Sequence, residues 1–145
     1  MRNRILALLF VLTIFTLLPE SINCQEDKLS GQCVSYLKGP YVSTGQAMRA
    51  FLTGDEVAEF HTTLYEGTIY RIVACSPKDD NIIFSVFDKD RNLLFNSYEH
   101  VNANFWDFKM IGSLECIIEA RLNPKKAASG MAMIMIGFKG DVELK

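Results

Sequence analysis

The acidic segment between residues 88 and 99 has residue types and a spacing that can bind calcium. Asp88, Asp90 and Asn92 alternate with basic residues, and Glu99 stands at the twelfth position of the segment. Carboxylate and amide oxygens at such positions can wrap a hard cation. However, Leu93 stands where a calcium loop needs glycine, and the intervening basic side chains repel the cation. We therefore interpret the segment as a polar β-hairpin turn, with a calcium site as the weaker alternative.

Side chains for catalysis are sparse in this sequence. The chain has two histidines, His61 and His100, and contains no G-x-S-x-G, H-E-x-x-H or phosphate-binding glycine motif. His61 shares a polar strand face and His100 lies in a polar stretch, so we interpret both as solvated surface residues rather than a zinc site or a general base. We expect neither enzyme activity nor a cofactor. A hydrolase with an unrecognised site is the most distant alternative.

Aromatic residues gather between positions 98 and 108, where the sequence has Tyr98, Phe105, Trp106 and Phe108. Exposed rings on a β-sheet can stack on sugar faces or anchor a protein partner. Trp106 and Phe108 would share one strand face, and packing in the core accounts for part of the set. Core packing is thus the preferred interpretation, and Tyr98 and Trp106 are the candidate binding surface.

The N-terminal segment has the layout of a signal peptide. Arg2 and Arg4 precede an apolar run from Ile5 to Leu18, which is shorter than the about 20 residues of a membrane-spanning helix. We predict a signal peptide over residues 1–24, cut after Cys24, and no transmembrane span after its removal. Cleavage before Cys24 is the alternative, since a new N-terminal cysteine could carry a lipid anchor and make an outer-membrane lipoprotein.

The remaining chain, residues 25–145, has the length of one domain. Removal of the signal peptide takes two basic and one acidic residue from a total of 15 basic and 17 acidic ones, which leaves a net charge of about −3. The longest basic run is the pair Lys125-Lys126, and phosphate binding requires a clustered positive face. We therefore exclude nucleic acid as a partner and expect a periplasmic or secreted protein.

Three cysteines remain after the preferred cleavage: Cys33, Cys75 and Cys116. Disulfides persist in exported proteins, and the wide separation of the three lacks the paired C-x-x-C spacing of zinc ribbons and thiol oxidoreductases. A disulfide is expected among them, and one cysteine stays unpaired within the monomer. The sequence leaves the pairing open.

The elements that must position these residues are one short helix and about eight strands. Apolar residues recur at helical spacing over Gln25–Lys38, and Gly39-Pro40 ends the helix. After this point the period changes to two. Turn residues separate the strands that we predict at Met48–Thr53, Glu56–Tyr65, Thr68–Cys75, Asn81–Phe87, Asn92–Ser97, Phe105–Met110, Leu114–Leu122 and Gly130–Phe138.

Short strands joined by short turns predict a mainly β fold, an eight-stranded antiparallel β-sandwich of jelly-roll-like form with an N-terminal helix. One strand departs from simple alternation. Both parities are apolar over Met131–Ile136, which is typical of a strand covered on both faces or lying beneath the N-terminal helix.

Three segments carry a resemblance to a known family: Gly67–Ala74, Asn81–Asp88 and Asn92–Phe95. In this order they resemble the bacterial pre-peptidase C-terminal domain, in which a G-x-x-Y strand precedes a D-x-x-x-x-V-x-D strand, a polar turn and a returning strand. Asn81 stands where an aspartate is usual. The resemblance implies a jelly-roll-like β-sandwich, and the longer chain is also similar to uncharacterised exported proteins of Gram-negative bacteria. Neither likeness implies an activity.

The sequence thus favours an exported, non-catalytic binding or accessory domain whose ligand is an unknown protein or glycan. The first alternative is a structural envelope protein held by a lipid anchor at Cys24. The second is the hydrolase considered above.

Overall fold

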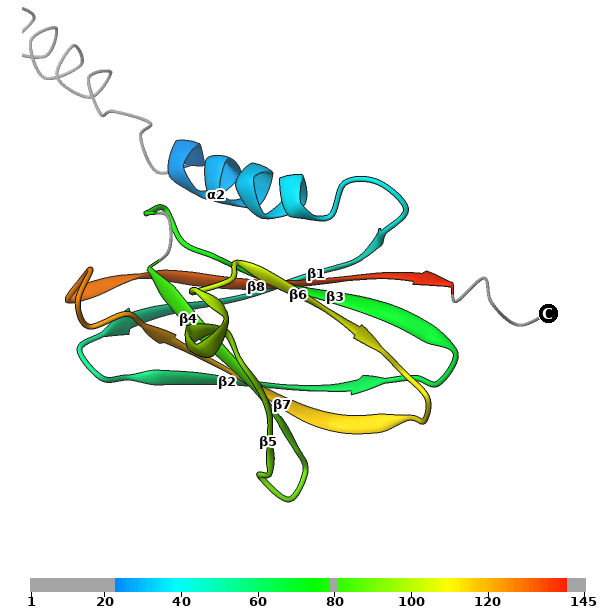
Figure 1. Ribbon diagram of the computed structural model, residues 1–145. Helices are drawn as coiled ribbons and strands as arrows, with labels where there is room; N and C mark the ends of the chain where they lie inside the picture. The colour runs from blue at the N-terminus through cyan, green and yellow to red at the C-terminus, as the bar shows by residue number, and fades with distance from the viewer. Residues whose placement is uncertain (1–22, 79–80, 141–145) are drawn as a thin grey trace, which may run out of the picture.

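The computed structural model describes residues 23–78 and 81–140, with side chains from Lys28 onward. Figure 1 shows one helix lying over two layers of strands. The elements follow one another as α2 (Asn23–Tyr36), β1 (Val42–Thr53), β2 (Val57–Leu64), β3 (Thr68–Cys75), β4 (Ile82–Asp88), β5 (Leu93–Asn96), the 3-10 helix η2 (Ser97–His100), β6 (Phe105–Lys109), β7 (Leu114–Leu122) and β8 (Ser129–Gly140).

The strands form two four-stranded antiparallel sheets, ordered β1-β8-β3-β6 and β2-β7-β4-β5. The predicted β-sandwich is therefore confirmed. The first strand was predicted to start at Met48 but begins at Val42, because a shift in its pairing with β8 between Ser43 and Ala47 interrupts the alternation that marks a strand. The helix ends at Tyr36, slightly before the predicted end.

Alternate side chains of both sheets meet in one core between the layers. Phe84 and Ile118 are fully buried at its centre, and the inward residues of β3, β7 and β8 pack around them. This arrangement follows from the period of two along each strand, which places every second side chain on the inner face.

A second apolar cluster lies on the opposite face of the first sheet, beneath α2. Leu29, Cys33 and Leu37 pack there against Met133 and Met135 of β8. The neighbouring residues of β8 point into the main core, so both faces of this strand are covered, as its apolar pattern predicted. None of the helices among residues 23–78 and 81–140 has the length and hydrophobicity of a membrane span.

Candidate functional site

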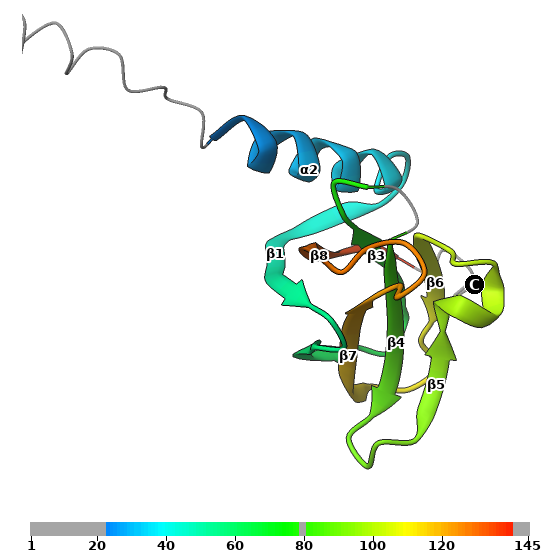
Figure 2. The ribbon, with the colours of Figure 1, turned by 90° about the vertical axis from the view of Figure 1, so that its left-hand side faces the viewer.

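One edge of the sandwich is formed by β5, the last strand of one sheet, and β6, the last strand of the other. The chain between them, residues 97–104, passes along this edge as η2 and the turn that follows it. Figure 2 shows η2 beside β5 and β6, on the outside of the molecule. We call residues 97–104, together with β5 and β6, the β5–β6 edge. It contains the aromatic residues that the sequence singled out.

Aromatic rings pack against one another and cover the core at this edge. The ring centroid of Trp106 lies 4.9 Å from that of Phe95 and 4.4 Å from that of His100. His100 also stacks on Phe95 at 5.1 Å. Phe108 meets Phe95 edge-on and packs against the core. His100 is exposed, as predicted, and its ring also packs against this aromatic cluster.

Trp106 combines the two roles considered from the sequence, packing against the core and offering a binding surface. One side of its indole is covered by Phe95 and His100, yet 38% of the residue is exposed. A half-covered tryptophan has a fixed orientation and still offers apolar surface to a partner. Tyr98, the other residue of the candidate surface, is 49% exposed.

The loop after β5 is held by one buried and one exposed hydrogen bond. The Oγ atom of Ser97, fully buried, accepts a hydrogen bond from the backbone N–H of Phe84 at 3.0 Å. Asn96 caps η2 by accepting from the N–H of Tyr98 at 3.0 Å. Ser97 thus anchors the loop inside the protein, while the next residue, Tyr98, is exposed.

The turn after η2 has an unusual backbone. Val101 and Asn102 adopt the left-handed conformation, with φ of 57° and 51°. A β-branched residue in this region is strained, and Val101 is 94% exposed, so its side chain gains nothing from packing. Strain of this kind is concentrated at sites where the conformation serves binding. Sequence reasoning missed Val101, since residue type alone does not reveal a positive φ.

A groove of about 490 Å³ runs beside β6 and adjoins this loop. Trp106, Phe105 and Tyr36 give it aromatic walls, and Asn104 and Asp107 supply polar groups. The amide of Asn104 donates to the hydroxyl of Tyr36 at 3.1 Å, which ties the end of α2 to the start of β6. The groove therefore depends on residues far apart in the sequence.

Arg71 forms an arginine clamp that contacts three residues of the groove lining, Tyr36, Phe105 and Asp107. Arg71 donates to both carboxylate oxygens of Asp107, at 2.7 and 2.8 Å, and to the backbone carbonyl of Tyr36 at 3.0 Å. Its guanidinium lies between the rings of Tyr41, at 4.2 Å, and Phe105, at 4.3 Å. Such a bidentate, stacked arrangement is specific to arginine. Residues from α2, β3 and β6 are thereby held in one geometry.

The clamp also changes the titration of its partners. Burial by itself raises the pKa of Asp107, but hydrogen bonds from Arg71 and Tyr41 and the charges of Arg71 and Lys139 outweigh it and hold this pKa below its ordinary value. Burial, followed by the 2.6 Å hydrogen bond that Tyr41 donates to Asp107, raises the pKa of Tyr41. Asp107 is therefore ionised at neutral pH.

The acidic segment is a hairpin turn. The carboxylate of Asp88 accepts hydrogen bonds from the N–H of Asp90 at 2.9 Å and from the N–H and amide of Asn92 at 2.8 Å each. These bonds, those of Asn92 above all, lower the pKa of Asp88. Glu99 belongs to η2. Within the described ranges no three His, Cys, Asp or Glu residues come together to hold a metal, so the structure does not assemble the weaker calcium alternative.

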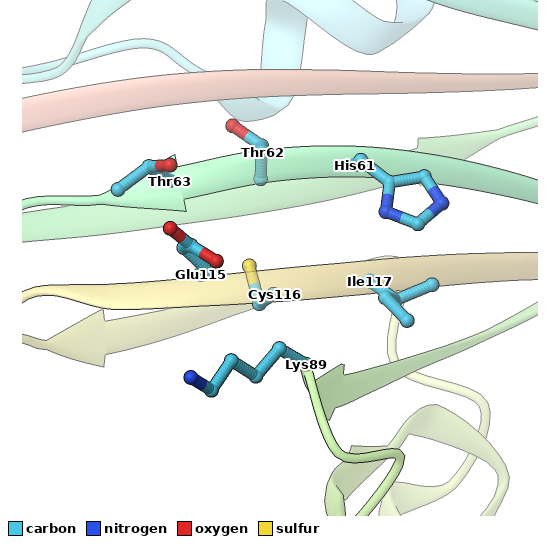
Figure 3. A pocket seen from close by; sticks show the side chains of 7 residues that line it. All are labelled: His61, Thr62, Thr63, Lys89, Glu115, Cys116 and Ile117. Carbon is cyan, nitrogen blue, oxygen red and sulfur yellow. The ribbon is translucent and has the colours of Figure 1, made fainter.

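A shallow pocket of about 300 Å³ lies on the second sheet, lined by residues of β2 and β7 and by Lys89. Figure 3 shows His61, Cys116 and Ile117 along it. His61 is exposed, as predicted, and its Nε2 lies 3.9 Å from Glu59. Burial raises the pKa of the Cys116 thiol to about 11. This thiol stays protonated at neutral pH and is a poor nucleophile, since the thiolate is the reactive form.

The structure also chooses among the cysteine pairings that the sequence left open. Cys33 of α2 and Cys75 of β3 form a disulfide with a Cα–Cα distance of 5.7 Å. Cys116 is the free, buried cysteine. Of the predicted signal peptide, residues 1–24, positions 1–22 lie outside the described residues, and the side chain of Cys24 is not described either. Both cleavage alternatives therefore stay predictions.

The fold defines a class, an antiparallel β-sandwich with one helix covering a sheet. No family model matches the chain, and no curated protein matches it. Among solved structures, the chain is similar to PliG of Aeromonas hydrophila, a periplasmic lysozyme inhibitor of g-type lysozyme, with a TM-score of 0.52 and 12% sequence identity. The match covers 70% of this chain and 90% of PliG. At this identity the likeness shows a shared fold, and the resemblance to the pre-peptidase C-terminal domain stays a prediction.

Proposed function

We propose that this protein is an exported, non-catalytic binding domain that contacts a folded protein partner through the β5–β6 edge. The observation that carries the proposal is the fixed presentation of Tyr98 and Val101 beside Trp106 and the aromatic groove. The sequence left the choice between a protein and a glycan open, and the exposed apolar tip of the loop favours a protein.

Exposed apolar side chains on a rigid loop are well suited to protein recognition. Aromatic residues in the centre of an interface contribute most of its binding energy. A loop that is already held in one conformation loses little entropy when it binds. The anchors at Asn96 and Ser97 and the left-handed turn at Val101 supply this pre-organisation.

The comparison and the disulfide add independent support. PliG has the same fold and inhibits g-type lysozyme, so a g-type lysozyme is the first partner to test. The Cys33–Cys75 disulfide fits an oxidising compartment outside the cytoplasm. Export through a signal peptide cut after Cys24 completes the proposal.

The first prediction concerns the loop tip. We expect the protein, purified from the periplasm of an expressing host, to bind g-type lysozyme and inhibit its lysis of cells. Val101→Asp and Tyr98→Ala should each weaken binding by at least about tenfold, because removal of a central interface contact costs of the order of 2 kcal/mol. Calorimetry gives the dissociation constants, and circular dichroism checks that each variant is folded.

Ile111 provides a matched control. It is 90% exposed but lies in the turn after β6, beyond the end of that strand remote from the loop. Ile111→Asp should leave binding unchanged. Equal losses in Val101→Asp and Ile111→Asp would contradict the loop as the contact site. Absence of binding to g-type lysozyme would remove this partner, and binding to purified peptidoglycan fragments that Trp106→Ala abolishes would indicate a glycan site instead.

A further inference from the structure

A second pocket enters between the two sheets at the edge formed by β1 and β2. This edge lies on the side of the sandwich opposite the β5–β6 edge. The pocket has a volume of about 360 Å³, which is within the range of small-molecule sites. The proposed protein contact at the β5–β6 edge does not use it.

The pocket lies where β1 is irregular, since Thr44 and Gln46 of this segment line it. The pairing of β1 with β8 shifts between Ser43 and Ala47, and Gly45 between them has φ of 79°. The hydroxyl of Thr44 donates to the carbonyl of Ile136 at 3.1 Å, which holds the irregular segment in place. Bulges are over-represented at sheet edges and next to functional sites.

The deep part of the pocket has apolar walls. Leu64, Tyr70 and Ile136 belong to the buried core, and Met48 packs against it. Tyr70 uses its hydroxyl to accept a hydrogen bond from the N–H of Tyr65 at 3.2 Å. A ligand body in this space would therefore meet hydrocarbon, sulfur and aromatic surface.

Hydroxyl groups line the mouth on the inner faces of the strands. Thr62 pairs with Cys116, a core residue, and Figure 3 shows both side chains pointing to the same side of the sheet. Thr68 has the same parity along β3 as the core residues Tyr70 and Ile72. Threonine in an inward position is costly unless its hydroxyl finds a partner. Valine has the same shape as threonine and would fill these two positions without the cost of an inward hydroxyl.

The lining has a further property, the absence of formal charge. It contains four threonines, one glutamine and one histidine but no Lys, Arg, Asp or Glu, although these four types make up 22% of the chain. An ionised ligand would lose its hydration here without gaining an opposite charge, which is unfavourable. A neutral molecule would lose much less.

We propose that this pocket binds a small neutral ligand with an aromatic or branched apolar body and a hydroxyl or carbonyl group. The apolar body occupies the space beside Met48 and Tyr70. The polar group exchanges hydrogen bonds with Thr62 and Thr68 at the mouth. Binding here is independent of the protein contact at the β5–β6 edge.

The test compares two probes of the same shape, neutral 2-naphthol and anionic 2-naphthoate, on the full exported protein. Two-dimensional NMR should show saturable shifts at Thr62, Thr68 and Tyr70 with 2-naphthol. The affinity for 2-naphthoate should be at least about tenfold lower, because its carboxylate has no cation to pair with. Equal affinity for the two probes, an absence of saturable shifts at millimolar 2-naphthol, or shifts confined to the surroundings of Trp106 would each overturn the proposal.

Isosteric variants locate the polar contact. Thr62→Val keeps the shape of the side chain and should weaken 2-naphthol binding about fivefold, the value of a lost hydrogen bond, without lowering the melting temperature. Ser129→Val, at an exposed strand position near the other end of the sandwich, should leave the affinity unchanged. Val101→Asp should also leave it unchanged, which separates this proposal from the proposed function. An unaltered affinity in Thr62→Val and Thr68→Val together would contradict the contact.

Discussion

Arg71 joins three segments of the chain at one point. Its guanidinium holds the Asp107 carboxylate of β6 and the Tyr36 carbonyl at the end of α2, and it stacks on Tyr41 in the connection to β1. The side chain is largely withdrawn from water, so its hydrogen bonds are not screened as those of a surface ion pair would be. The clamp thereby sets the shape of the groove that Phe105 and Trp106 line.

The lowered pKa of Asp107 gives a prediction of pH dependence. A carboxylate whose folded pKa lies below its ordinary value, 3.8, stabilises the fold above that value and loses this contribution as the pH falls through the folded pKa. Asp107→Asn should therefore be less stable than the wild type at neutral pH, and the difference should shrink below about pH 4. Urea unfolding from neutral to acid pH measures it. A difference that stays constant over this range would contradict the role of the ionised carboxylate.

The helix α2 is attached to the sandwich by three kinds of contact. Leu29 and Leu37 are buried against β8, Cys33 is joined to β3, and the backbone of Tyr36 accepts from Arg71. Gly137 of β8 allows the close approach, because a Cβ atom at this position would lie 2.7 Å from Cδ2 of Leu37. The helix is therefore part of the described fold and helps to form the groove beside β6.

Removal of the disulfide should loosen this helix and lower the stability of the whole domain. Cys33 and Cys75 are 42 residues apart, and closing a loop of this length is worth about 3–4 kcal/mol in the unfolded chain. Cys33→Ala with Cys75→Ala should reduce the free energy of unfolding by about this amount, measured with urea. Reductant should destabilise the wild type to the same extent and leave the double variant unaffected. Cys116→Ala is the control, because it should retain the full sensitivity to reductant.

At the scale of the whole molecule, the sandwich has two edges with different chemistry. The β5–β6 edge presents aromatic rings and an exposed loop held by hydrogen bonds, which suits a macromolecular partner. The β1–β2 edge opens into an uncharged pocket, which suits a small molecule. The core between the sheets separates the two edges, so each site can be altered by mutation without disturbing the other.

The mature form of the molecule is tested by its intact mass from the native host, measured without reductant. We expect a chain that begins at Gln25 and is lighter by two hydrogens than its reduced form, because Cys33 and Cys75 are joined. A chain that begins at Cys24 and carries acyl groups would contradict the predicted cleavage and favour a lipid-anchored envelope protein. A mass without the two-hydrogen deficit would contradict the disulfide.

The sequence by itself determined the elements and the faces of the strands. The period of two located the strands, and the apolar residues at both parities of Met131–Ile136 predicted a strand covered on both sides, as β8 is. These features are local, since each depends on residues a few positions apart. The start of β1 was missed because the bulge after Ser43 breaks that local pattern.

Only the tertiary structure decided which distant side chains meet. It paired Cys33 with Cys75, packed the ring of His100 against that of Trp106, and brought Arg71 to Asp107, 36 positions away in the chain. It also showed that the Asp88 carboxylate accepts hydrogen bonds from the backbone of the turn. Such contacts depend on strand order and on the crossing of the two sheets, and the period of a sequence carries no information about either. The surfaces on which both proposals rest are therefore products of the topology.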